Sequence, residues 1–235
     1  TKALISSAVM LESIKKGPDF GIDISGYKLD FKRIQQRKEG IVKKLSQGLE
    51  SLFKNSKIYI INRHARFIDS NTVEAEGEKV KSEYIIIATG STPAQKEKLK
   101  FDHNNVLSSK DALEVKELPP SLIVIGGGVI GCEFASLFNR LGTRVTIIEQ
   151  MNQLLPGEDK EIAKRLANSL KKNGIEIILN ARLNKIDKSA EGVECELEGI
   201  GCKKSAKALL CIGRKPLIED LGLEEIGLQI KDGAI

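Results

Sequence analysis

Residues 122–149, LIVIGGGVIGCEFASLFNRLGTRVTIIE, decide the fold class of this chain. The short apolar run at 122–125 predicts a buried parallel strand, and the helical pattern that follows it ends at Gly142. A second apolar strand is predicted at 145–148, and Glu149 follows it directly. Because a strand, a glycine turn, a helix and a second strand form a βαβ unit, we predict an α/β fold with a doubly wound parallel sheet.

Three glycines in this unit have the GxGxxG spacing of a dinucleotide-binding turn. Gly126 allows a tight turn, Gly128 lets the backbone approach a pyrophosphate, and Gly131 lets the helix pack closely on the strand. The pyrophosphate is expected at the free N–H groups and the positive dipole end of the helix. The alternative is a structural glycine turn in an ordinary βαβ unit.

Glu149 indicates which dinucleotide the turn takes. It ends the second strand, close to the position about 20 residues beyond the glycine turn at which an acid meets the adenine ribose. A carboxylate accepts hydrogen bonds from the ribose diol and repels a 2′-phosphate, so NAD is favoured over NADP. The alternative is a solvated acid at a strand end.

Composition narrows the class of protein. The chain has 235 residues, 41% hydrophobic and 29% charged, which is enough for one large or two modest globular domains. No apolar run approaches the roughly 18 residues of a membrane span, so no membrane association is expected. The net charge is +5, but lysine and arginine are scattered among acids and tryptophan is absent, which argues against a nucleic-acid surface.

The cysteines do not form a recognisable redox or metal motif. None of the four has CxxC or CxxxxC spacing, and they stand at Cys132, Cys195, Cys202 and Cys211. Only His64 and His103 are available to supplement a metal site, so none is predicted. Cys132 lies in the first turn of the predicted helix, where a thiol pKa can fall, but a packing role is favoured.

Outside the βαβ unit the pattern predicts alternating helices and strands. Helices are predicted at 3–14, at 31–54 with Asp30 as its cap, and at about 158–172. Strands are predicted at 57–61, 65–69, 72–76, 79–81, 84–88, 175–179 and 208–212, with a small antiparallel insertion at 183–187, 193–197 and 203–207. Residues 93–120 are predicted to be an extended connection.

Several motifs together resemble a known family. They are ATGS at 88–91, GGGVIGCEFA at 126–135, Glu149 at a strand end, and CIGRKP at 211–216 followed by GLEEIGLQI. These resemble the pyridine nucleotide-disulfide oxidoreductases, and within them the dihydrolipoamide dehydrogenase group, over essentially the whole chain. The resemblance implies two interleaved Rossmann-like dinucleotide-binding domains, with an NAD domain inserted into an FAD domain.

The resemblance also implies a domain division and a reaction. We expect a partial FAD-binding domain with connection at 1–119, an NAD-binding domain at 120–210 and a return into the FAD domain at 211–235. In this group dihydrolipoamide and NAD give lipoamide and NADH through a redox disulfide and FAD. The implied partners are a lipoyl domain of a 2-oxoacid dehydrogenase complex and a second copy of the enzyme. The implied compartment is bacterial cytoplasm or mitochondrial matrix.

The catalytic groups of the resembled family are expected outside this sequence. Thr1-Lys2 looks like the last two residues of the Pro-Ser/Thr-Lys that follows the family's CxxxxC disulfide, and neither His64 nor His103 matches its His-Glu base. The sequence is therefore expected to be a central fragment with no catalytic residue of its own and no activity alone. The alternatives are a related reductase of the mercuric reductase or transhydrogenase type, or a stand-alone NAD-binding module.

Site residues are carried over by position. The expected NAD contacts are Gly126, Gly127, Gly128, Val129, Ile130, Gly131, Cys132, Glu133, Glu149, Leu183 and Gly213. The expected FAD contacts are Lys2, Ala65, Thr89, Gly90, Ser91 and Arg214. Lys2 resembles the lysine beside the flavin ring, Glu133 the acid near the nicotinamide that pairs with it, and Arg214 an arginine at the flavin edge. The family often has glycine where this chain has Arg63, which weakens the carry-over to Ala65.

Each carried-over role has a structural alternative. Lys2 is alternatively a frayed terminal lysine, and Glu133 a solvated acid in the first turn of a helix. Thr89, Gly90 and Ser91 alternatively form an ordinary turn at a strand end. Arg214 is alternatively a surface arginine.

Overall fold

A computed structural model describes all residues, 1–235, as a mixed α/β chain. Its contacts divide it into two compact units, which are described separately below. The first unit comprises Thr1–Lys43 with Pro93–Gly213, and the second comprises Lys44–Thr92 with Arg214–Ile235. None of the helices combines the length and the apolar composition of a transmembrane span.

The first unit is built on a five-stranded parallel sheet. Its strands run in the order β5-β12-β6-β7-β8, and every neighbouring pair is parallel. Their bounds are β5 Val106–Leu107, β6 Ser121–Ile125, β7 Arg144–Ile148, β8 Glu176–Ile178 and β12 Lys207–Leu210. All five residues of β6 are buried, as expected of a central parallel strand covered on both faces. The predicted α/β fold with a parallel sheet is confirmed.

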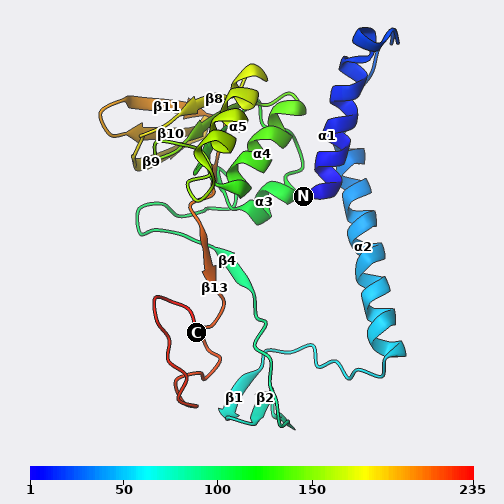
Figure 1. The fold of residues 1–235 in the computed structure, drawn as a ribbon, viewed down its shortest axis with the longest axis vertical. Coiled ribbons are helices and arrows are strands. Elements are labelled where there is room, and N and C mark those ends of the chain that lie inside the picture. The colour runs from blue at the N-terminus through cyan, green and yellow to red at the C-terminus, as the bar shows by residue number, and fades with distance from the viewer. The chain divides into compact units, whose positions relative to one another are not determined.

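Two helices, α4 (Val129–Arg140) and α5 (Lys160–Lys172), lie side by side on one face of this sheet (Figure 1). Capping residues in the sequence mark where these helices begin and end. The Asp159 carboxylate caps α5 by accepting from the N–H groups of Glu161 and Ile162, at 2.9 and 3.1 Å. The apolar face of α4 is buried against β6 and β7. This packing fixes the first turn of α4 directly after the glycine turn.

The opposite face of the parallel sheet carries a small antiparallel sheet. It has the order β11-β10-β9, with β9 at Leu183–Ser189, β10 at Gly192–Leu197 and β11 at Gly201–Ser205. Val193, Cys195 and Leu197 alternate along β10 and are buried against side chains of β6 and β12. The predicted antiparallel insertion is therefore confirmed, within a few residues at each end.

The connection predicted at 93–120 is more structured than expected. It contains β5, which extends the parallel sheet beside β12, and the short helix α3 (Ser109–Glu114). Ser108 and Asp111 form a reciprocal capping box at the start of α3. The predicted domain boundary at residue 120 thus falls within the parallel sheet. The sequence did not reveal β5 and α3, because a two-residue strand and a six-residue helix are too short to produce a periodic pattern.

The N-terminal helices α1 (Lys2–Lys15) and α2 (Phe31–Asn55) agree with the predicted ranges. Helix α1 packs on α4 through buried leucine and alanine side chains, and the Glu12 carboxylate accepts from the Arg140 guanidinium at 2.7 Å. A 3₁₀ helix, η1 (Gly17–Phe20), follows α1. The predicted cap of α2 is present, since the Asp30 carboxylate accepts from the Arg33 N–H at 3.0 Å.

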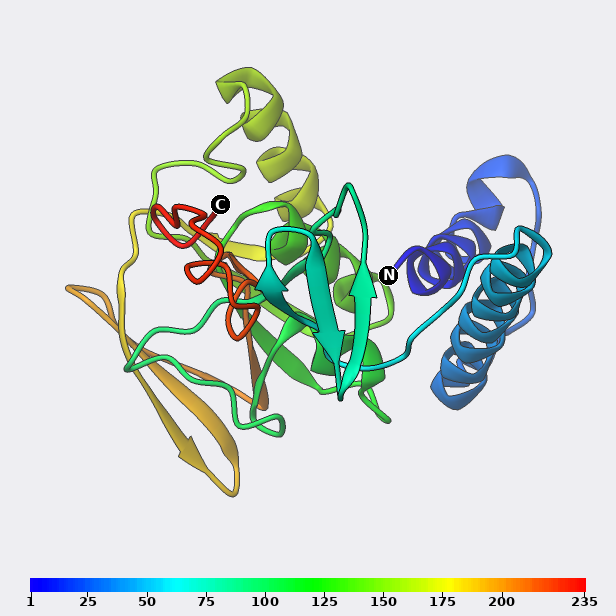
Figure 2. The same ribbon diagram turned by 90° about the horizontal axis from the view of Figure 1, so that it is seen from below.

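The second unit contains two small sheets, the first of them antiparallel. One is formed by β1 (Arg66–Asp69), β2 (Thr72–Ala75) and β3 (Glu78–Lys81), and appears in teal in Figure 2. The other pairs β4 (Ser91–Pro93) with β13 (Arg214–Pro216).

Two predicted strands of the second unit are wrong. Residues 57–61 and 84–88 form no strand, and the side chains of Tyr84 and Ile86 are 81% and 89% exposed. No segment of the chain pairs with either run. An apolar, β-branched run becomes a strand only where another strand completes its backbone hydrogen bonds, so composition alone misled the prediction.

Candidate functional site

The glycine turn stands at the carboxyl end of β6, where close contacts require glycine. Gly126 has φ +103°, and a Cβ there would come 2.3 Å from the Cys211 carbonyl oxygen. A Cβ on Gly131 would come 2.0 Å from the Gly126 carbonyl oxygen. Both distances are far below van der Waals contact, so these glycines let the turn pass between β12 and the first turn of α4.

The open side of the turn fits a pyrophosphate. A Cβ on Gly128 would meet no heavy atom within 4 Å. The N–H groups of Gly128, Val129 and Ile130 donate to no other group of the chain. Free N–H groups at the positive end of a helix dipole form an anion-binding site, so the turn has both the space and the donors for a phosphate pair.

Glu149 is fixed at the carboxyl end of β7 by the turn itself. Its side chain is only 5% exposed. Its Oε2 accepts from the Gly127 N–H at 2.6 Å and its Oε1 from the Met151 N–H at 2.8 Å. Each carboxylate oxygen keeps a free lone pair, so the side chain can still accept from a ribose hydroxyl. The sequence predicted the ribose-binding role of Glu149 but not its second role, which is to tie the glycine turn to the loop after β7.

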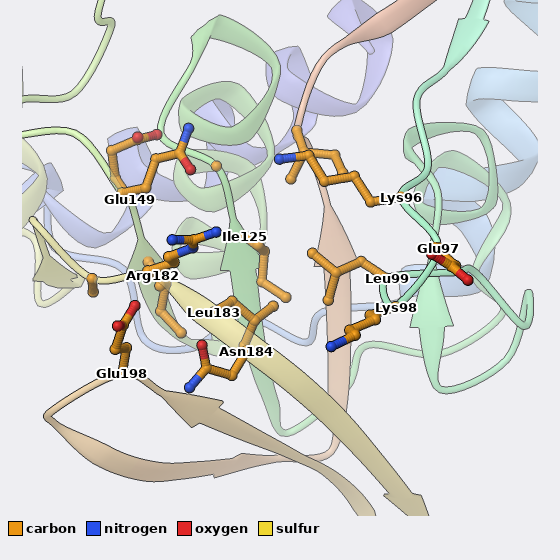
Figure 3. A pocket seen from close by; sticks show the side chains of 15 residues that line it. Lys96, Glu97, Lys98, Leu99, Ile125, Glu149, Arg182, Leu183, Asn184 and Glu198 are labelled. Carbon is orange, nitrogen blue, oxygen red and sulfur yellow. The ribbon is translucent and has the colours of Figure 1, made fainter.

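A cavity of about 520 Å³ opens at this edge of the sheet. Its walls include Gly126, Ile125 and Glu149 from the ends of β6 and β7, and Arg182 and Leu183 from the segment after β8. Figure 3 shows the side chains of Ile125, Glu149, Arg182 and Leu183 around the cavity, with Lys96 on the opposite wall. The edge lies beside the point where strand order reverses around β6, which is where open α/β sheets bind ligands.

The structure brings together only part of the predicted NAD set. Gly126, Glu149 and Leu183 line the 520 Å³ cavity. Gly213 follows β12 with φ +124°. Val129, Cys132 and Glu133 face a separate cavity of about 320 Å³, shared with Ile5 of α1.

Three cations on the cavity wall were not predicted. They are Lys96, Lys98 and Arg182, and none of them forms an ion pair within the chain. Lys96 and Lys98 belong to the segment expected to be a connection, and Arg182 to the segment after β8. No motif in the sequence marks these positions, because they reach the cavity only through the tertiary fold.

The helix start does not activate Cys132. Its Sγ donates to the Gly127 carbonyl oxygen at 3.3 Å. Burial, reinforced by the charge of Glu149, raises the pKa of this thiol to about 11. Burial and the neighbouring Cys132 raise the pKa of Cys211 to about 12. Both thiols stay protonated at neutral pH, which agrees with the packing interpretation.

The predicted FAD contacts of the second unit fall into two groups. Ser91 and Arg214 lie on the paired strands β4 and β13, where the Arg214 Nε donates to the Ser91 Oγ at 2.7 Å. Gly90 has φ +77°, and its carbonyl oxygen accepts from the Leu217 N–H at 3.0 Å. Thr89 precedes this turn. Ala65 immediately precedes β1, away from these strands in sequence.

Lys2 and Glu133 are both exposed and stand on the packed helices α1 and α4. No hydrogen bond or ion pair joins their side chains. Their proposed pairing stays a prediction.

Comparison with known proteins decides the family. The family model for pyridine nucleotide-disulphide oxidoreductases matches residues 2–235. The chain belongs to this family. Its members named dihydrolipoyl dehydrogenase use FAD and NAD.

Two curated bacterial relatives are similar along the whole chain. A dihydrolipoyl dehydrogenase of Bacillus subtilis (strain 168) is 37% identical over 100% of this chain and 53% of its own length. One from Geobacillus stearothermophilus is 38% identical over 98% of this chain and 50% of its own length. The chain therefore spans about half the length of the curated relatives it matches.

Solved structures are also similar to this chain along its length. LpdA from Mycobacterium tuberculosis has a TM-score of 0.89 at 25% identity, covering 99% of this chain and 52% of its own. The HOCl-induced flavoprotein disulfide reductase RclA from Escherichia coli has a TM-score of 0.82 at 29% identity, covering 99% of this chain and 50% of its own. These similarities extend to the whole length of the chain, including its second unit.

Proposed function

We propose that this chain is the central part of an NAD-linked, FAD-dependent dihydrolipoyl dehydrogenase. The observation that carries the proposal is the glycine turn, with free N–H groups on one side and the Gly127 N–H bonded to the buried carboxylate of Glu149. The relatives named dihydrolipoyl dehydrogenase support the reaction. In that reaction dihydrolipoamide and NAD give lipoamide and NADH through a redox disulfide and FAD.

The residues of this chain bind and orient the nucleotide. The N–H groups of Gly128, Val129 and Ile130 bind the pyrophosphate, and Glu149 accepts from the ribose hydroxyls. Leu183 and Gly213 add backbone contacts. The flavin and the nicotinamide supply the hydride chemistry when bound, and the protein positions them.

The FAD side of the proposal rests on the other carried-over residues. Arg214, held against Ser91, is proposed to lie at the flavin edge, with Thr89 and Gly90 in the adjoining turn. Ala65 is proposed to contact the FAD adenine through its backbone. We keep the proposed division into FAD-binding residues 1–119 and 211–235 and NAD-binding residues 120–210. Strand β5, which precedes residue 120, nevertheless belongs to the same parallel sheet as the glycine turn.

The redox disulfide and the His-Glu base are proposed to lie outside this sequence. Thiol–disulfide exchange needs a thiolate and a partner sulfur at bonding distance. Cys132 and Cys211 have raised thiol pKa values, and Cys195 is fully buried, with burial raising the pKa of its thiol to about 12. A buried, protonated thiol is a poor nucleophile, which supports placing the disulfide elsewhere.

The wider biological setting is proposed by similarity. The partners are a lipoyl domain of a 2-oxoacid dehydrogenase complex and a second copy of the enzyme, and the compartment is bacterial cytoplasm or mitochondrial matrix. A reductase with another oxidant, of the mercuric reductase or transhydrogenase type, is the alternative within the family. The alternative without catalytic activity is a stand-alone NAD-binding module.

The proposal predicts binding without turnover for the 235-residue chain. We expect the purified chain to bind NAD in a titration and to give no reduction of NAD by dihydrolipoamide with added FAD, because the disulfide is absent. The longer dihydrolipoyl dehydrogenase of Bacillus subtilis, of which this chain covers 53%, is the positive control of the assay and should be active. Turnover by the 235-residue chain near that of the longer protein would contradict the placement of the catalytic groups.

A second prediction concerns Lys2 and Glu133. If they form the proposed pair beside the flavin ring, a zero-length carbodiimide should link the Lys2 amine to the Glu133 carboxylate, detected as a joined peptide by mass spectrometry. The ion pair of Lys203 with Glu176, at 2.6 Å, provides an internal positive control. If the control link forms and the Lys2–Glu133 link does not, the assignment of Lys2 or Glu133 to the flavin site is wrong. If the Lys2–Glu133 link forms, the Glu133→Gln variant should not form it.

A further inference from the structure

Arg182 occupies an unassigned position in the dinucleotide cavity. It follows Ala181, whose N–H donates to the Glu149 carbonyl oxygen at 3.0 Å, so the backbone holds residue 182 next to Glu149. Figure 3 shows the Arg182 side chain projecting into the cavity between Glu149 and Ile125. Arg182 therefore presents a cation on the same wall as the proposed ribose-binding acid.

The guanidinium of Arg182 has no partner of its own. Its side chain is exposed and makes no hydrogen bond or ion pair within the chain. A second acid on the cavity wall is Glu198, whose backbone N–H donates to the Arg182 carbonyl oxygen at 3.0 Å. The carboxylate of Glu198 forms no ion pair with Arg182. All five donors of the guanidinium are thus available to a ligand.

Glu149, in contrast, is already engaged. Its two oxygens accept backbone N–H groups of Gly127 and Met151, which partly offset its negative charge. In dinucleotide-binding folds an acid at this strand end binds the ribose diol, and a nearby arginine accommodates a 2′-phosphate. A guanidinium also matches the geometry of a phosphate through paired hydrogen bonds. This cavity contains both residue types.

We propose that Arg182 is a specificity-determining residue that gives the cavity a second, weaker capacity for adenine nucleotides with a 2′-phosphate. NAD stays the preferred dinucleotide because Glu149 accepts from the ribose diol. Arg182 offsets the repulsion between Glu149 and a 2′-phosphate. The affinity for NADP is therefore higher than it would be with Glu149 alone. This inference rests on the proposed function, because it places the adenine end of the dinucleotide in this cavity.

The test compares two small ligands that differ only in the 2′-phosphate. The purified protein is titrated calorimetrically with 5′-AMP and with 2′,5′-ADP. In Arg182→Met the affinity for 2′,5′-ADP should fall roughly tenfold, as expected for the loss of a charge-assisted phosphate contact, while that for 5′-AMP stays within about twofold. Arg182→Lys keeps the charge without the paired donors and should lie between.

Arg165→Met is the matched control. It removes the same side chain from α5, where Arg165 pairs with Glu161 at 2.7 Å outside the cavity, and should change neither affinity. Unchanged discrimination between the two ligands in Arg182→Met, with normal NAD binding, overturns the inference alone. Failure of the unsubstituted protein to bind NAD overturns the proposed function, and the inference with it. Equal loss of both ligands in Arg182→Met shows a structural or general adenylate role and also overturns the specificity role.

Discussion

Replacing Glu149 with alanine is expected to weaken NAD binding by about ten- to a hundredfold, corresponding to roughly 1.5–3 kcal/mol for charge-assisted hydrogen bonds to the ribose. The variant loses these bonds and also the acceptors of the Gly127 and Met151 N–H groups. Binding of NADP should suffer much less, since the same change removes a repulsive charge. Titration of both dinucleotides measures the two effects separately.

A more conservative variant separates the two roles of Glu149. In Glu149→Gln the side-chain amide oxygen still accepts from one backbone N–H group. The side-chain NH2 group then faces the other backbone N–H group and cannot accept from it, so the turn is only partly supported. Glu198→Gln is the control, because Glu198 lines the same cavity without contacting the glycine turn, and should leave NAD binding within about twofold. Equal affinities of the unsubstituted protein for NAD and NADP would contradict the assigned role of Glu149.

The βαβ unit was predictable from sequence because its requirements are local. The turn at Gly126 needs a positive φ, and Gly131 faces the Gly126 carbonyl within the next helical turn. The positive φ and the contact of Gly131 act within a few residues, so the residue types alone reveal them, whereas the contact of Gly126 with the Cys211 carbonyl oxygen depends on the tertiary fold. The apolar periodicity of the flanking strands and helix predicts the same βαβ structure. Agreement between this periodicity and the glycine spacing makes the prediction reliable.

The strands at 57–61 and 84–88 failed for the opposite reason. A strand depends on a partner that is usually distant in the sequence, and these runs have none in the chain. The helix α3 was missed because six residues give no measurable period, although Ser108 and Asp111 form a capping box of the kind that marks a helix start.

The site itself was predictable only where a motif encodes it. Glu149 was found from its distance to the glycine turn, but its bond to the Gly127 N–H depends on the burial of its side chain. Arg182 was missed because it reaches the cavity through the packing of the segment after β8 against β7. Side chains that meet through tertiary packing leave no spacing rule in a single sequence.

The glycine turn also provides the largest expected effect on stability. A Cβ on Gly131 would lie 2.0 Å from the Gly126 carbonyl oxygen and 3.2 Å from the Val124 Cγ1. Because the first contact is with backbone, Gly131→Ala must push α4 away from β6 and open the packing beneath it. Overpacking of this kind costs about 3 kcal/mol. That free energy corresponds to a melting temperature lower by roughly 6–12 °C for a chain of this size.

Gly128→Ala tests whether the effect comes from the close contact rather than from the motif as a whole. Gly128 has φ −71°, and its Cβ would meet nothing within 4 Å, so the melting temperature should stay within about 2 °C. The added methyl group would nevertheless occupy the space in which the pyrophosphate approaches, so NAD binding should weaken roughly tenfold. Thermal unfolding and NAD titration of both variants therefore separate the two glycines: Gly131 supports the packing of α4, and Gly128 keeps the backbone accessible to the phosphates. A melting temperature of Gly131→Ala equal to that of the unsubstituted protein would contradict the close approach of α4 to β6.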